Sequence, residues 1–192
     1  MTTLDKALAM STIPKAQVDH IMQWRELWAD HVYWTRLVVI GIVDSAPGLD
    51  QAVARLMKSC MDMTDLVRMY YGDEGAQAFN TLMTAHLSLA AKLVTEAAAG
   101  QAMEADATEK QWYENADEIA HFLATANPYL PETALRNLLD EHLRLTKDEA
   151  VARITKDYAM DVAAFDKILA QAYGMSDALA DGIIKQFETR FM

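Results

Sequence analysis

The scarcity of chain-breaking residues is the feature that most constrains this sequence, because its 192 residues include only seven glycines and four prolines. Glycine and proline are the residues that interrupt regular helices most strongly, so long stretches of the chain carry no stop signal. Within these stretches, apolar residues recur at steps of three and four, which is the period of an α-helix. No segment alternates with a period of two, as a strand would. The sequence therefore predicts an all-α fold without a β-sheet.

The few breaks divide the chain into long and short helices. Four long helices are expected at 16–43, 73–99, 103–126 and from 131 to beyond 158. One or two shorter helices fill 50–71, and a last helix covers 176–191 after a break at Gly174. A chain of this length is long enough to bury a core as one domain. We therefore expect a bundle of four long helices with extra helices, in a single domain that covers 1–192.

Two parts of the sequence resemble each other and indicate a pseudo-duplication. The string Thr84-Ala-His-Leu-Ser-Leu resembles Asp140-Glu-His-Leu-Arg-Leu, and the string Trp28-Ala-Asp-His resembles Trp112-Tyr-Glu-Asn. Two related helical hairpins would then form the halves of the bundle, at about 16–100 and 102–191. In this interpretation the repeat partners are His86 with His142, and His31 with Asn115.

Charge and composition exclude several classes of function. A net charge of −11 argues against nucleic acids, whose phosphates need clustered Lys and Arg. The longest strongly apolar run, Leu37 to Val43, is far shorter than the roughly 20 residues of a membrane-spanning helix. No secretory signal is expected in Met1 to Lys15, and the single Cys60 allows neither an internal disulfide nor a CxxC pair. We expect a cytoplasmic protein without nucleic-acid or membrane partners, and a homo-oligomer stays open.

Polar side chains interrupt the apolar face of every long helix near its middle. Buried imidazoles and carboxylates are unfavourable unless they are hydrogen-bonded, paired or bound to a ligand, so four such interruptions at similar depth indicate a shared site. Neutral imidazole together with carboxylate is a suitable ligand set for Fe, Mn or Zn. The sequence therefore predicts a divalent transition-metal site, with redox or metal-handling roles, whose ligands are His31, His86, His142 and Glu118.

A second set of residues is expected to surround this site and to bind a ligand there. It consists of Asn115, Glu149, Thr35, Arg36, Trp28 and Trp112. These residues also support two alternatives: a pocket for a small organic molecule, or an interaction protein whose polar core only fixes helix register. A histidine on an apolar face is, taken singly, more often a hydrogen-bonded core residue than a ligand, and Glu149 has Arg153 four residues further as an alternative partner.

Signatures of catalysis are missing from the sequence. There is no nucleophile with a base at recognisable spacing, no phosphate-binding glycine-rich loop and no dinucleotide-binding fingerprint. The sequence leaves open whether the protein is an enzyme.

Several strings are similar to those of an uncharacterised family of bacterial all-helical bundles. They are Leu27-Trp-Ala-Asp-His-Val-Tyr-Trp-Thr-Arg36, Trp112-Tyr-Glu-Asn-Ala-Asp-Glu118 and Glu141-His-Leu-Arg-Leu-Thr146. The resemblance implies a cytoplasmic bacterial protein and supplies no activity. A looser similarity links the chain to ferritin-like and hemerythrin-like metal bundles. Ferritin-like di-iron sites use glutamates and Glu-x-x-His pairs, but Ala152 stands where the second histidine of such a pair would follow Glu149, so a mononuclear site fits the residues better than a di-iron centre.

Overall fold

The computed structural model describes residues 13–192, and over this range it is entirely helical with no strand. The prediction of an all-α bundle is confirmed. The expectation that no secretory signal is present falls almost wholly on residues outside the described range. The helices are α2 (Lys15–Asp44), α3 (Leu49–Ala98), α4 (Ala102–Ala126), α5 (Glu132–Ile154), α6 (Tyr158–Gln186) and the short η1 (Glu188–Arg190).

Gly72 bends α3 into two helical segments, one before and one after it. Its backbone has φ 71° and ψ −174°, a conformation that glycine adopts without the steric penalty of a Cβ atom. The sequence places a helix end at this glycine, and the structure shows a sharp kink in a nearly continuous helix. One helix therefore belongs to two successive helical hairpins.

The break expected at Gly174 is wrong, because this glycine lies inside α6. The chain turns earlier, at 155–157, where the side chain of Asp157 accepts a hydrogen bond from the backbone N–H of Met160 and caps α6. A single glycine inside a helix costs only about 1 kcal/mol. Burial of Met175 and Ser176 beside Gly174 is consistent with a helix that continues through it.

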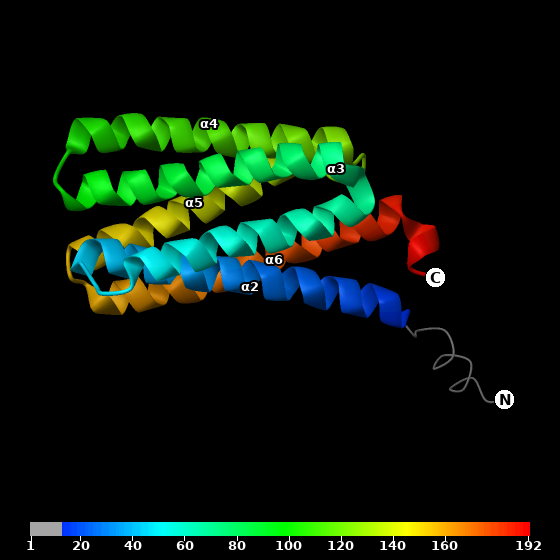
Figure 1. The fold of residues 1–192 in the computed structure, drawn as a ribbon, viewed down its shortest axis with the longest axis horizontal. Helices are drawn as coiled ribbons and strands as arrows, with labels where there is room; N and C mark the ends of the chain where they lie inside the picture. Colours follow the sequence, from blue (N-terminus) through cyan, green and yellow to red (C-terminus); the bar gives the residue numbers. More distant parts are fainter. Residues whose placement is uncertain (1–12) are drawn as a thin grey trace.

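Three helical hairpins make up the bundle. The first pairs α2 with the part of α3 before Gly72, the second pairs the rest of α3 with α4, and the third pairs α5 with α6. Figure 1 shows that the three hairpin connections lie at one end of the bundle, while the Gly72 kink and the α4–α5 connection lie at the other. The twofold duplication is not confirmed, because residues 50–71 and the segment after Tyr158, which the two expected hairpins leave out, each form a regular helix of a hairpin.

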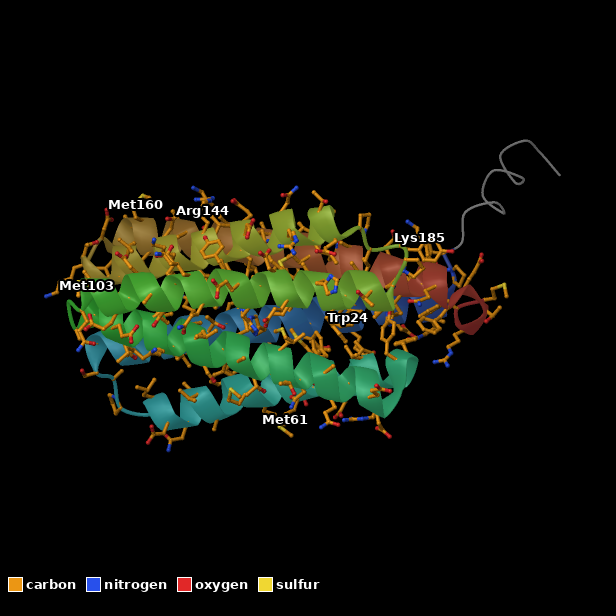
Figure 2. All side chains as sticks on the ribbon, turned by 90° about the horizontal axis from the view of Figure 1, so that it is seen from above. Trp24, Met61, Met103, Arg144, Met160 and Lys185 are labelled. Carbon is orange, nitrogen blue, oxygen red and sulfur yellow. The ribbon has the colours of Figure 1, made fainter. Side chains whose placement is uncertain are left out.

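Equivalent positions of the three hairpins are buried in the bundle interior. The first helices of the hairpins align with offsets of 55 and 56 residues, so that His31, His86 and His142 correspond. Four further sets of positions near the histidines follow the same offsets, and every member of each set is buried: Trp24, Phe79 and Leu135; Trp28, Met83 and Leu139; Val32, Leu87 and Leu143; Val39, Val94 and Ala150. Figure 2 shows Trp24 among the helices, whereas Met61 and Met103 lie on the outside. No helix of the described chain combines the length and apolar character needed to span a membrane.

Candidate histidine site

His86 and His142 make the same hydrogen bonds in two different hairpins. His86 Nδ1 lies 2.9 Å from Asn115 Oδ1, and the amide of Asn115 donates to the backbone oxygen of Leu82 at 3.2 Å. His142 Nδ1 lies 3.0 Å from Gln171 Oε1, and the amide of Gln171 donates to the backbone oxygen of Leu138 at 2.8 Å. In each case the amide residue follows its histidine by 29 positions. The two histidines thus occupy corresponding places in the second and third hairpins, within a threefold pattern instead of the expected twofold one.

These amide contacts determine which ring nitrogen carries the proton. Both amides donate through their nitrogen to a backbone oxygen, so their side-chain oxygens face the imidazoles as acceptors. Nδ1 of each ring is then the protonated donor, and Nε2 keeps its lone pair. Each of these two histidines is thus oriented, and in the tautomer that ligates through Nε2.

His31 differs from the other two because its hairpin provides no amide. The second helices of the hairpins align with offsets of 56 and 56 residues, so the position equivalent to Asn115 and Gln171 is Ser59, 28 residues after His31. Its hydroxyl donates to the backbone oxygen of Leu56 in its own helix at 2.7 Å. Among the described residues, buried His31 Nδ1 has no hydrogen-bond partner. His31 is therefore the one imidazole of the three whose Nδ1 is held by no hydrogen bond among the described residues.

The three histidines line one small cavity of about 30 Å³ in the bundle interior. The ring centroids of His31 and His142 are 6.1 Å apart, and the edge of Trp28 meets both rings, at 5.5 Å from His31 and 5.9 Å from His142. Apolar side chains complete the lining, among them Met83, Leu139 and Met175. The cavity holds about one or two water-sized groups, and imidazoles are the main polar groups around it.

Burial keeps all three imidazoles neutral. Desolvation lowers the pKa of His86 and of His142 from 6.5 to about 4. It lowers the pKa of His31 well below 6.5, and repulsion from His142 and His86 adds to the effect. At neutral pH each ring therefore has one unprotonated nitrogen.

Glu118 does not join the histidines. It is exposed on α4 and lines a surface depression with His121 and Arg136. The inward position of this helical turn belongs to Ile119, which lines the histidine cavity. Glu118 was predicted as a carboxylate on the apolar face of this helix, but it lies at the edge of that face, and the neighbouring Ile119 takes the buried position.

The other predicted residues fall into three groups. Trp28 lines the histidine cavity, and Asn115 holds His86. Thr35 and Trp112 line a separate, larger cavity, although the Trp112 ring also packs on His86 at 5.4 Å between centroids. Arg36 and Glu149 pair with each other away from the histidines.

This pair belongs to a buried ionic cluster near the hairpin connections. Arg36 contacts Glu149 and lies 2.6 Å from Asp161, and Arg153 lies 3.2 Å from Asp161 and also contacts Asp44. Both Glu149 and Asp161 are 2 % exposed or less. Burial raises the pKa of Glu149 to about 7, although Arg36 opposes this shift. Arg153, the alternative partner considered for Glu149, contacts Asp161 and Asp44.

Gln171, Ser59 and Asp161 are the residues that the sequence reasoning missed. A spacing of 29 residues after His86 and after His142 leads to an amide side chain in both hairpins, and this signal identifies Gln171. Asp161 stands where the other hairpins have Leu49 and Ala105. A carboxylate at a position that is apolar in the other two hairpins could have identified it in the sequence.

Comparisons with known proteins identify no relative of this chain. The resemblances noted from the sequence strings therefore stay predictions. No family model matches the chain, and neither a curated protein nor a solved structure matches it.

Proposed function

We propose that this protein binds one divalent transition-metal ion through His31, His86 and His142. The observation that carries the proposal is the convergence of three neutral imidazoles, one from each hairpin, on a single cavity of about 30 Å³. A water molecule needs about 10 to 15 Å³ by the same kind of measure. The cavity thus suits an ion with a bound water and is too small for an organic molecule.

The protonation state of the site supports metal binding. Imidazole ligates only in its unprotonated form, and the pKa of about 4 of His86 and His142 keeps both rings in that form at neutral pH. Asn115 and Gln171 hold Nδ1 of these rings, as hydrogen-bond acceptors commonly do for metal-binding histidines. Two of the three ligands thus need no change of tautomer.

Binding requires the rings to move toward one another. Among residues 13–192 no three His, Cys, Asp or Glu side chains already stand together as a metal site. The ring centroids of His31 and His142, 6.1 Å apart, are also slightly too distant. His31 is the ring that closes this gap, since no hydrogen bond holds its Nδ1.

The donor set favours zinc among Fe, Mn and Zn. No carboxylate lines the described cavity, and Mn²⁺ prefers oxygen ligands. Three neutral nitrogen donors with one open position are a common arrangement for Zn²⁺. Zn²⁺ has no redox chemistry, so a metal-handling role is compatible with it, whereas a redox role would require Fe or Mn.

Metal content and thermal stability test the proposal. Protein purified from cells grown with added Fe, Mn and Zn is analysed for bound metal, and the metal-free protein is titrated with each ion while its Tm is measured. We expect about one equivalent of bound metal and a rise in Tm, because the ion binds only the folded chain. His142→Ala and His86→Ala should lose the metal.

His20→Ala is the matched control for these variants. His20 is equally buried on α2, but its Nε2 accepts a hydrogen bond from Trp24 and it does not line the cavity. This variant should keep the metal even if it is less stable. If the wild-type protein carries no metal and its Tm does not change when Fe, Mn or Zn is added, the histidines are a structural cluster.

A further inference from the structure

A second and larger cavity lies in the part of the bundle nearest the hairpin connections. It has a volume of about 300 Å³ and is lined by residues of all three hairpins, with no histidine among its lining residues in the described range 13–192. Its lining includes the buried set Val39, Val94 and Ala150, and it extends to exposed residues such as Gly100. Trp112 lies between this cavity and His86. The two cavities are therefore neighbours with different chemistry.

Comparison of the three hairpins shows how the space arises. The second hairpin has alanine at three lining positions where the first has larger residues. The correspondences are Ala90 with Thr35, Ala97 with Ile42, and Ala105 with Leu49. Protein interiors are normally close-packed, and voids destabilise them. The repeat itself contains side chains that would occupy this volume, and the second hairpin lacks them.

Charges at the edge of the cavity limit which molecules it accepts. Asp106, Glu109 and Lys147 line it, and Lys147 Nζ lies 2.7 Å from both carboxylate oxygens of Glu109. The only cation among the described lining residues is therefore already paired, and the carboxylate of Asp106 adds a negative charge. An anionic ligand would meet repulsion without a free positive partner.

We propose that this cavity binds an uncharged small molecule with a mostly apolar surface, of the class of medium-chain alcohols. Its volume is at the lower end of the range of small-molecule pockets, roughly 300 to 1,000 Å³. Apolar cavities of this kind exclude water and take up apolar molecules. The site is independent of the metal site, since none of the three histidines lines it.

Titration with 1-octanol and with octanoate tests the proposal on the full chain. Binding is followed by calorimetry and by the Tm at increasing ligand concentration. We expect saturable binding of 1-octanol and a rise in Tm, and about tenfold weaker binding of octanoate because of its charge. Absence of saturable 1-octanol binding, or equal affinity for octanoate, would overturn the proposal.

Filling the cavity with residues from the first hairpin gives the decisive variant. Ala97→Ile with Ala105→Leu introduces the side chains of Ile42 and Leu49 at their equivalent positions, and it should abolish 1-octanol binding while the protein stays folded. The control makes the same exchanges on exposed positions of the same helices, Ala85→Ile with Ala107→Leu, and should bind like the wild type. Undiminished binding by the filled variant would contradict the proposal. His142→Ala, which should lose the metal, should still bind 1-octanol, so the two proposals fail separately.

Discussion

The histidine cavity and the ionic cluster are two ways of burying polar side chains in one bundle. Around the cavity, His86 and His142 are neutral and are held by amides. In the cluster, carboxylates of Glu149 and Asp161 are held by Arg36. Burial moves the pKa of the histidines down and that of Glu149 up, in each case toward the uncharged form. The arginines of the cluster stay charged throughout the pH range in which proteins are folded, whereas the imidazoles are neutral. Ion pairing therefore stabilises the cluster but not the histidine cavity.

The largest expected difference between the two regions is in their pH dependence. His86 and His142 have a pKa of about 4 in the folded protein and 6.5 when exposed. The unfolded chain takes up protons first, so their contribution is complete above pH 6.5 and is lost as pH falls through 4. Each histidine should contribute roughly 3 kcal/mol to this loss. Urea unfolding between pH 4 and pH 8 measures it, and His142→Gln should reduce the slope by about one proton.

Glu149 should act with the opposite sign in the same experiment. Its pKa is about 7 in the folded protein and 4.5 when exposed, so its stabilising effect is complete below pH 4.5 and is lost as pH rises through 7. Glu149→Gln should remove this opposing slope. If both variants changed the slope in the same direction, the contrast between the two regions would be wrong.

Removing the positive charge of the cluster should have the next largest effect. Arg36→Met leaves Glu149 and Asp161 buried beside Arg153 alone and should lower the free energy of unfolding by about 3 kcal/mol. The control is Arg144→Met. Arg144 pairs with Glu141 and Asp148 at the surface, as Figure 2 shows by its outward position, and this variant should cost less than about 1 kcal/mol.

A double variant separates lost pairing from lost packing in the cluster. Arg36→Met with Glu149→Leu places the residue type of Leu93 at the equivalent position of the third hairpin and should recover part of the loss. Equal destabilisation by Arg36→Met and Arg144→Met would show that the cluster behaves as an ordinary surface network.

The smallest effect is expected from giving His31 the partner that the other histidines have. Ser59→Asn places an amide at the position equivalent to Asn115 and should raise the free energy of unfolding by about 1 kcal/mol, through one hydrogen bond to His31 Nδ1. The reciprocal Asn115→Ser should lower it by about 2 kcal/mol, because it leaves His86 Nδ1 and the Leu82 oxygen without partners. Destabilisation by Ser59→Asn would mean that no space for the amide exists beside His31.

Helix positions were predictable from the sequence because local periodicity and chain-breaking residues determine them. The expected helix at 16–43 is α2, Lys15–Asp44, and the one at 103–126 is α4, Ala102–Ala126. The errors occurred where local signals compete. Gly174 resembles a break but is bridged by α6, and the true turn at 155–157 contains no glycine or proline.

The threefold pattern was not recognised in the sequence because residues at equivalent positions differ in type between the hairpins. Trp28 and Trp112 look like repeat partners, yet the first lies on the first helix of its hairpin and the second on a second helix. The true counterparts of Asn115 are Ser59 and Gln171, three different residue types at one position. The convergence of His31, His86 and His142 was predictable from burial on apolar faces, whereas the outward position of Glu118 depended on the rotation of α4.

The side-by-side position of α2 and α6 has a consequence for how the chain folds. Each hairpin forms from neighbouring segments, but α2 and α6 come from opposite ends of the described sequence and meet through contacts such as Arg25 with Asp177, 152 positions apart. Closing so long a loop costs more conformational entropy than closing the short loop within a hairpin. Docking of α6 on α2 should therefore be a late step, and hydrogen exchange should show the α2–α6 boundary opening more readily than the second hairpin.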